Sequence, residues 1–220
     1  MKLVIYGNSD FAELVSYYFT NDSKYEVVGF CVDKDFIKSD NFLDKPLVSF
    51  EEVEKIFPPN EYKMFVAVGY KNMRLRTKLY KKTVDKKYEH INYISSKSIT
   101  DESNIIGKNN AILHGVVLEP FAKIGDNNII NTNVTICHHA KIMNDCFIAA
   151  KSLVGGFTII KNKCFIGFSS TILQKLIIED ETLIASGSIV NKNSSKFDFL
   201  AGTPAKVVSK HKEKGIEIKG

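Results

Sequence analysis

The sequence predicts a small parallel α/β domain followed by a coiled stack of short strands, because two different patterns divide the chain. Ile, Leu or Val recurs every sixth residue from Ile94 to Val190, at 16 of 17 positions, and only Thr100 breaks the register. These three residue types account for 55 of the 220 residues, so chance does not explain the repeat. Before residue 90 the repeat is absent, and apolar runs alternate with helical patterns.

Three apolar runs in the first 90 residues read as buried strands, at residues 2–6, 26–32 and 63–68. Apolar residues at helical spacing lie between or after them, at residues 11–19, 50–57 and 73–84. This alternation is typical of a small Rossmann-like sheet, whose ligands bind beyond the carboxyl ends of the parallel strands. The turn after the first strand has Ser9 where the dinucleotide fingerprint needs its second glycine, so we do not expect a dinucleotide site.

A period of six fits neither an α-helix nor a simple alternating strand, so each repeat is predicted to be a short extended segment followed by a turn. Glycine follows the aliphatic residue at Gly107, Gly125, Gly155 and Gly167, where we expect a positive φ. The position two before the aliphatic residue is usually small, which suits a tight corner: Ala122, Val134, Ala140, Cys146, Ser152, Thr158, Cys164, Ser170, Thr182 and Ser188.

Composition and charge point to a cytoplasmic protein that binds neither nucleic acid nor a membrane. No run of about 18 apolar residues is present, and the N-terminus reads as a buried strand and not as a signal peptide. The net charge of +5 is spread along the chain and is not interleaved with aromatics as in a single-strand binder. A modest positive field instead suits phosphorylated small molecules. The four cysteines lack zinc-type spacing, so we expect them to be reduced and structural.

The best catalytic candidate is the pair His138 and His139. This pair follows Cys137, which comes directly after the repeat aliphatic Ile136. Two of the five histidines of the chain lie here, whereas the other corners carry mostly Asn, Lys, Asp, Ser and Gly. Imidazole has an ordinary pKa near 6.5, so it can accept a proton at neutral pH from an amine or hydroxyl that attacks a thioester.

The repeat, the segment Asn131–Ile142 and the motif Gly202–Lys206 resemble the hexapeptide-repeat sugar acyltransferases, which include sialic acid O-acetyltransferases and bacillosamine-pathway N-acetyltransferases. The resemblance implies a Rossmann-like nucleotide-sugar-binding domain at residues 1–90, a left-handed parallel β-helix with three repeats per coil at 91–208, and a basic tail at 209–220. It also implies an acetyl-CoA-dependent N-acetyltransferase without a metal that acts on a nucleotide-linked amino-deoxysugar. Such a protein would be a cytoplasmic homotrimer with active sites between subunits, used in making surface glycans such as lipopolysaccharide O-antigen.

The family pattern also assigns roles to individual residues. His138 would be the general base, while His139, which replaces a glutamate that orients the base, could bind the acceptor, share the base role or simply cover the surface. Gly156 would lie one coil above His138 and stabilise the oxyanion. The acyl-CoA would run along Ala185, Ser186, Gly187, Pro204 and Lys206. The nucleotide sugar would contact Gly7, Asn8, Asp33, Gly69, Asn72 and Arg74.

Three other interpretations remain open at this point. A sugar O-acetyltransferase of the sialic acid type differs only in the acceptor atom. A non-catalytic β-helix scaffold, as in carbonic-anhydrase-like proteins, would share the repeat. The zinc-dependent members have histidines in adjacent coils, 18 residues apart, whereas His114 lies four repeats, or 24 residues, before His138. A nucleophilic Cys137 would need a basic partner beyond its own neighbours.

Overall fold

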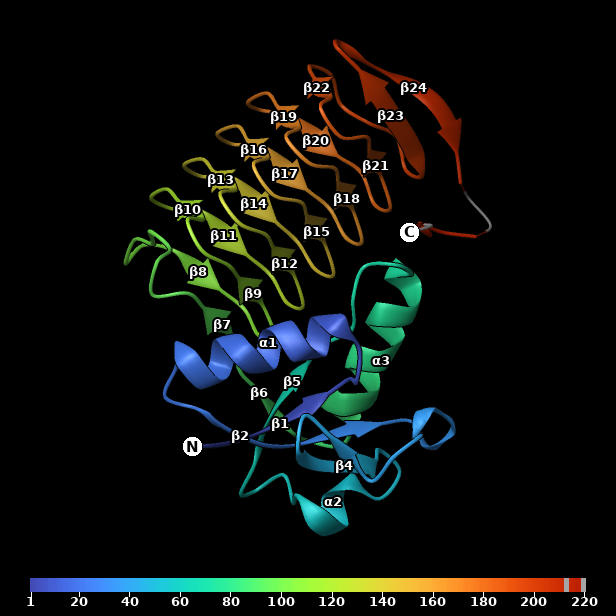
Figure 1. Ribbon diagram of the computed structural model, residues 1–220. Coiled ribbons are helices and arrows are strands. Elements are labelled where there is room, and N and C mark those ends of the chain that lie inside the picture. Colours follow the sequence, from blue (N-terminus) through green and yellow to red (C-terminus); the bar gives the residue numbers. More distant parts are fainter. Residues whose placement is uncertain (212–213, 219–220) are drawn as a thin grey trace. The chain divides into compact units, whose positions relative to one another are not determined.

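The computed structural model describes residues 1–211 and 214–218, and the chain divides into two compact units (Figure 1). Met1–Gly69 and Lys78–Tyr93 form the first unit, and Tyr70–Thr77 and Ile94–Gly220 form the second. The predicted division lies at residue 90, whereas the first unit extends to Tyr93 and residues 70–77 cluster with the repeat domain. The basic tail expected at 209–220 begins inside a strand that ends at Lys210, and residues 212, 213, 219 and 220 of that tail lie outside the described residues.

The first unit is built on a six-stranded sheet in the order β3-β4-β2-β1-β5-β6. All neighbours are parallel except β3 and β4. The strands are β1 (Lys2–Tyr6), β2 (Glu26–Val32), β3 (Asn41–Phe42), β4 (Lys45–Ser49), β5 (Lys63–Val66) and β6 (Glu89–His90). The helices are α1 (Asp10–Asn21), η1 (Lys34–Phe36), α2 (Val53–Ile56) and α3 (Met73–Asp85), and the last of these extends from the second unit into the first.

Apolar patterning explains these elements. Residues 3–6 of β1 are all buried, as expected of a central parallel strand that is covered on both faces. Helix α1 buries Ala12, Val15, Ser16 and Phe19, which lie on one side at helical spacing. The sequence therefore identified the three central strands and all three helices, with ends that differ by a few residues.

The second unit is a parallel β-helix with three faces (Figure 1). Face 1 contains β8 (Ile105–Ile106), β11 (Lys123–Ile124), β14 (Lys141–Ile142), β17 (Ile159–Ile160) and β20 (Ile177–Ile178). Face 2 contains β7 (Tyr93–Ile94), β9 (Ala111–Ile112), β12 (Ile129–Ile130), β15 (Phe147–Ile148), β18 (Phe165–Ile166), β21 (Leu183–Ile184), β23 (Asp198–Gly202) and β24 (Ala205–Lys210). Face 3 contains β10 (Val117–Leu118), β13 (Thr135–Ile136), β16 (Leu153–Val154), β19 (Thr171–Ile172) and β22 (Ile189–Val190).

Each coil consists of three six-residue repeats, since Thr135 pairs with Leu153 and Leu153 with Thr171. The repeat aliphatics from Ile112 to Val190 form one continuous buried column, with the small corner residues packed beside them. The chain passes from face 1 to face 2 to face 3 and back to face 1, so the β-helix is triangular in cross-section. We name each of its three edges after the two faces that it joins: edge 1/2, edge 2/3 and edge 3/1.

The expectation of a positive φ at the glycines after the aliphatic residues is wrong. Positive φ occurs two residues later, for example at Asn127 (56°) after Gly125 and at Phe157 (61°) after Gly155. These glycines are needed for space, because a Cβ on Gly125 would lie 2.7 Å from the backbone oxygen of Met143 in the next coil. Close approach of successive coils, and not a left-handed backbone, is the reason for glycine here.

The segment Tyr70–Thr77 packs on face 2 of the β-helix. The Tyr70 ring lies 4.3 Å from that of Phe147, measured between centroids. Arg76 is 1% exposed and donates to the backbone oxygen of Asn127, which belongs to a ladder of side chains from Asn109 to Asp145 at edge 1/2. Burial lowers the pKa of Arg76 to about 10, and the charge of Asp145 opposes that shift, so the guanidinium stays protonated at neutral pH. No sequence pattern had indicated this packing.

Candidate active site

The two predicted histidines lie at edge 3/1, between β13 and β14. His139 has a φ of 61°, which turns the chain there. The Nδ1 atoms of His138 and His139 are 3.3 Å apart, and their ring planes are nearly perpendicular at 87°. A hydrogen bond between two Nδ1 atoms requires one of them to carry the proton and the other to present its lone pair. If His138 donates, its Nε2 atom is left unprotonated and can accept a proton.

A carboxylate fixes the backbone beneath the pair. Glu119 lies one coil before Cys137, and its Oε2 accepts a hydrogen bond of 2.7 Å from the backbone N–H of His138. This contact holds the corner but does not reach the imidazole, so it differs from an orienting carboxylate on the ring. Sequence reasoning missed Glu119, although its position one full coil before Cys137 is a signal that the repeat supplies.

Gly156 lies where the coil length predicts, one turn along the β-helix from His138. A Cβ on Gly156 would lie 3.0 Å from both Cε1 and Nε2 of His138, so only glycine allows the imidazole edge to approach this backbone. Within the described part of the chain, the N–H of Gly156 donates to no acceptor. An available backbone donor beside the imidazole nitrogen is the arrangement that an oxyanion site needs.

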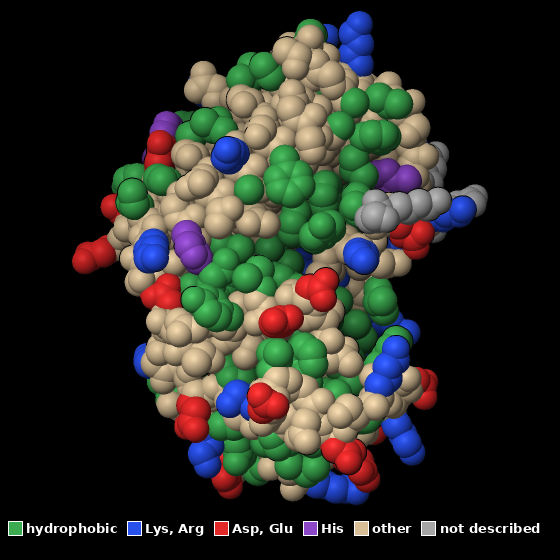
Figure 2. Space-filling model, in the orientation of Figure 1, with side chains coloured by type: hydrophobic (Ala, Val, Ile, Leu, Met, Phe, Trp, Pro, Cys, Tyr) green, Lys and Arg blue, Asp and Glu red, His purple; other side chains and the backbone are tan. Residues whose placement is uncertain are grey.

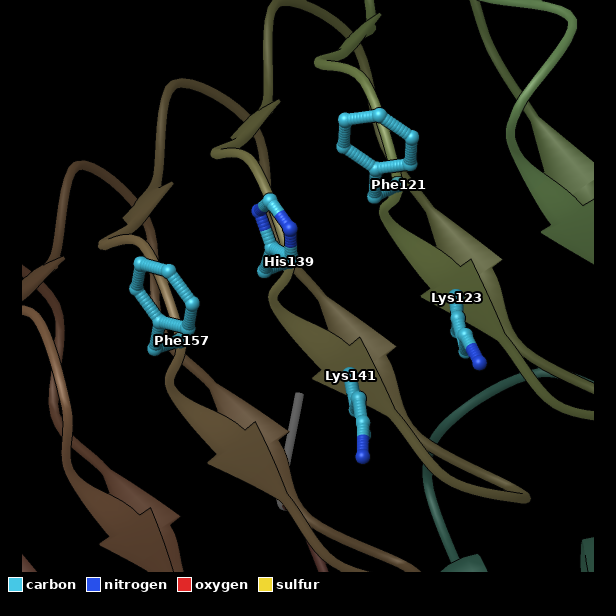
Figure 3. Close-up of a pocket in the computed structure, with 5 residues that line it drawn as sticks. All are labelled: Phe121, Lys123, His139, Lys141 and Phe157. Atoms are coloured by element: carbon cyan, nitrogen blue, oxygen red, sulfur yellow. The ribbon is translucent and has the colours of Figure 1, made fainter.

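Aromatic rings flank His139 in the neighbouring coils (Figure 3). The His139 ring stacks on Phe157 at 4.7 Å and 16°, and lies 4.8 Å from Phe121 on its other side. Phe121 is 51% exposed and Phe157 is 47% exposed, which is unusual for such large apolar side chains. With Lys123 and Lys141 these three rings line a cavity of about 360 Å³. The stack of Phe121, His139 and Phe157 was not predicted from the sequence, although its successive members are one coil apart.

Cys137 has the wrong surroundings for a nucleophile. Partial burial and the neighbouring Glu119 raise the pKa of its thiol, which disfavours the thiolate. The described residues also contain no group of three or more His, Cys, Asp or Glu that could hold a metal ion.

The residues predicted to contact acyl-CoA lie at a different edge from the histidines. Ala185, Ser186 and Gly187 follow β21 at edge 2/3, and an added Cβ on Gly187 would meet no atom within 4 Å. Pro204 and Lys206 belong to the hairpin of β23 and β24, where the Thr203-Pro204 bond is cis. One chain therefore brings together His138, His139 and Gly156, but it does not bring them together with this second group.

In the first unit, four predicted residues gather at the carboxyl ends of β1, β2 and β5. Gly7 donates to the backbone oxygen of Cys31 at 2.9 Å, and its close approach to Ala67 leaves no space for a side chain. The Asn8 side chain donates to the Phe36 backbone oxygen at 3.3 Å. Around Gly69 an added Cβ would meet nothing within 4 Å, so this turn is open.

Asp33, the fourth of these residues, is held by two side chains that sequence reasoning missed. The Tyr6 hydroxyl donates to its Oδ1 at 2.6 Å, and the Lys82 ammonium contacts both carboxylate oxygens at 2.7 and 2.8 Å. Burial alone would raise the pKa of Asp33, but the hydrogen bonds from Lys82 and Tyr6 outweigh it and lower that pKa. Asp33 is therefore an oriented carboxylate at the carboxyl end of β2.

The last two predicted residues, Asn72 and Arg74, belong to the second unit and make structural contacts there. The Asn72 side chain accepts from the Leu75 N–H at 2.8 Å, as a cap at the start of α3, and donates to Glu217 at 3.1 Å. Arg74 forms an ion pair of 2.7 Å with Glu181, whose side chain is 9% exposed. A ligand of Asn72 or Arg74 would have to compete with these partners.

Charges of both signs are interspersed over the face drawn in Figure 2. None of the helices in the described residues combines the length and the apolar character that crossing a bilayer requires.

Comparison with known proteins covers both units. The model of the PglD N-terminal domain matches residues 2–83, and the model of the bacterial transferase hexapeptide, with six repeats, matches residues 121–156. The predicted family resemblance is confirmed. No curated protein sequence gives a significant match to the chain.

Solved structures of similar hexapeptide-repeat proteins align over nearly the whole chain. The acetyltransferase domain of PglB from Neisseria gonorrhoeae is 19% identical, with a TM-score of 0.84 and coverage of 94% of this chain and 99% of that one. PerB from Caulobacter crescentus, in complex with CoA and GDP-perosamine, is 23% identical, with a TM-score of 0.82 and coverage of 95% and 98%. A GDP-perosamine N-acetyltransferase from Caulobacter crescentus with one histidine replaced by alanine, also with CoA and GDP-perosamine, is 22% identical, with a TM-score of 0.83 and coverage of 95% and 97%. At these identities the likeness establishes the fold, and the predicted α/β domain followed by a left-handed parallel β-helix is confirmed.

Proposed function

We propose that the protein is an acetyl-CoA-dependent N-acetyltransferase that acts on the amino group of a nucleotide-linked amino-deoxysugar. The observation that carries this proposal is the position of His138, whose Nε2 edge lies against Gly156 at a corner that also holds His139. The two-domain match supports it, since PerB combines the same architecture with CoA and GDP-perosamine. One structure of the GDP-perosamine enzyme, with CoA and GDP-perosamine, has a histidine replaced by alanine.

The chemistry follows from these groups. The amino nitrogen of the sugar attacks the thioester carbonyl while Nε2 of His138 takes a proton from that nitrogen. The backbone N–H of Gly156 donates to the oxyanion that forms. The C–S bond then breaks, the amide is complete, and the departing CoA sulfur receives the proton from His138. Transfer is direct, within a complex of enzyme and both substrates, and needs no metal.

We infer that the working enzyme is a homotrimer with acetyl-CoA bound between subunits. The residues assigned to acyl-CoA border edge 2/3, whereas His138 borders edge 3/1, and face 3 separates these two edges. If three chains pack through face 3, edge 3/1 of one chain meets edge 2/3 of the next, and the two groups come together. The outward row of face 3 contains no charge, which favours this packing: Val117, Thr135, Leu153, Thr171 and Ile189.

The first domain would supply the acceptor. Gly7, Asn8, Asp33 and Gly69 lie at the strand ends where ligands of parallel sheets bind. The oriented Asp33 carboxylate suits an N–H group of a nucleobase or a ribose hydroxyl, while Asn72 and Arg74 would contribute only by exchanging their present partners. We place the reaction in the cytoplasm, in the assembly of a surface glycan such as lipopolysaccharide.

The test is release of CoA thiol from acetyl-CoA with UDP-, GDP- and dTDP-linked 3-amino and 4-amino deoxysugars, with sialic acid as the comparator. Turnover with an amino sugar, lost in a folded His138→Ala variant, is the expected result. Turnover with sialic acid alone would replace the proposal by O-acetylation. If the wild-type protein releases no CoA thiol with any acceptor, the result would favour a non-catalytic scaffold.

A further inference from the structure

Two lysines lie side by side on face 1, next to the histidine corner. Lys123 on β11 and Lys141 on β14 are direct partners in the parallel register. Both are exposed, and their side chains extend in the same direction (Figure 3). The equivalent outward positions in the other coils of this face are Ile105, Ile159 and Ile177. Charge therefore occurs on this row in two of the three coils that line the cavity at His139, and the third, with Phe157, carries Ile159.

The two ammonium groups have no counterion in the part of the chain that the structure describes. At edge 1/2, in contrast, Lys161 pairs with Glu179 at 2.8 Å. Adjacent strands are about 4.8 Å apart, so two like charges in register repel each other. An anion with negative oxygens on both sides would remove this repulsion and neutralise both lysines at once.

The cavity limits what kind of anion fits. Phe121, His139 and Phe157 form its aromatic side, and Lys123 and Lys141 form its basic side (Figure 3). A volume of about 360 Å³ exceeds what a single inorganic ion fills and lies at the lower end of small-molecule sites. The lining therefore suits a phosphorylated organic molecule whose apolar or planar part contacts the rings.

We propose that Lys123 and Lys141 together bind the diphosphate group of a substrate, beside the histidine pair. This inference rests on the proposed acetyl transfer, in which two substrates carry a diphosphate: the nucleotide-linked sugar and CoA. Lys123 and Lys141 are one strand spacing apart, so each can contact one phosphate of the same diphosphate, and we assign them a role in binding and not in proton transfer.

The experiment compares Lys123→Gln, Lys141→Gln and the double variant with Lys108→Gln as a matched control. Lys108 is an exposed lysine at edge 1/2, so its replacement removes the same charge away from the cavity. The expected result for the double variant is a rise of about tenfold or more in KM for one substrate, with kcat and Tm nearly unchanged. A rise for the sugar nucleotide identifies its diphosphate as the ligand, and a rise for acetyl-CoA identifies that of CoA.

An unchanged KM for both substrates, or an equal rise in Lys108→Gln, would overturn the inference while leaving acetyl transfer intact. Calorimetric titration with inorganic pyrophosphate and with CoA gives a readout that does not depend on turnover. Equal affinity of wild type and double variant for both probes would also overturn it, even if the wild-type protein acetylates nothing and the proposed function itself fails.

Discussion

Among the described residues, the imidazole of His138 hydrogen-bonds to the ring of His139 and to no carboxylate. His139 is stacked on Phe157 and contacts Phe121, so its ring plane is fixed from both sides. Its Nδ1 then meets Nδ1 of His138 at 3.3 Å. Glu119 adds a hydrogen bond to the His138 backbone. If His139 accepts that hydrogen bond, it keeps the proton on Nδ1 of His138 and leaves Nε2 free, which is the positioning role that we propose for it.

This role predicts different outcomes for two substitutions of His139. His139→Phe keeps an aromatic ring between Phe121 and Phe157 but removes the nitrogen, and we expect kcat to fall about tenfold to a hundredfold, part of the 10²- to 10⁴-fold that positioned proton transfer supplies. His139→Asn tolerates the positive φ and keeps a polar side chain, so it should retain more activity. The measurement is kcat and KM across a pH series. If His139 only covered the surface, its replacement would leave the fall of kcat at low pH at the same pH as in the wild type. Equal activity of His139→Phe and wild type at all pH values would rule out the positioning role.

At the scale of the coil, sequence patterns predicted the repeat because each coil depends on its own local residues. The aliphatic residues from Ile112 to Val190 and the small corner residues are visible in the sequence and are all buried in the structure, whereas Ile94 is 38% exposed and Ile106 is half-buried. The contacts that were missed join residues without a local pattern, such as Tyr6 and Lys82 on Asp33, or Arg76 on Asn127. These contacts depend on tertiary packing that periodicity does not encode. The reason for glycine after the aliphatic residue was missed because it lies in the next coil.

The steric role of these glycines can be tested on stability. Gly125→Ala places a methyl group 2.7 Å from the Met143 backbone oxygen, and we expect a loss of about 3 kcal/mol in the free energy of unfolding, since the coils must move apart. Gly187→Ala is the control, because its methyl group meets no atom within 4 Å and only its φ of 70° is unfavourable, at about 1–2 kcal/mol. Denaturant unfolding of both variants gives the comparison. A Gly125→Ala protein as stable as the wild type would show that the coils can adjust without cost.

At the scale of the whole molecule, the three faces of the β-helix have different surroundings. Face 2 is covered by Tyr70 and the residues that follow it. Face 1 carries the lysine pair at the cavity. Face 3 has an outward row without charge. We therefore expect the proposed trimer to pack through face 3.

A charge placed on face 3 should consequently break the trimer and abolish activity together. Leu153 on face 3 is 37% exposed in the single chain, and Ile177 on face 1 is 38% exposed, so Leu153→Glu and Ile177→Glu are a matched pair. We expect Leu153→Glu to sediment as a monomer and to lose acetyl transfer, because burying an unpaired carboxylate in three symmetric contacts costs several kcal/mol and separates edge 3/1 from edge 2/3 of the next chain. Ile177→Glu should remain trimeric.

Analytical ultracentrifugation shows whether each variant is a trimer, and activity measured on the same samples shows whether the site is complete. A Leu153→Glu protein that remains an active trimer would place the interface on another face, whereas a monomeric protein with full activity would mean that one chain holds the complete site and that acetyl-CoA binds without edge 2/3 of a neighbour.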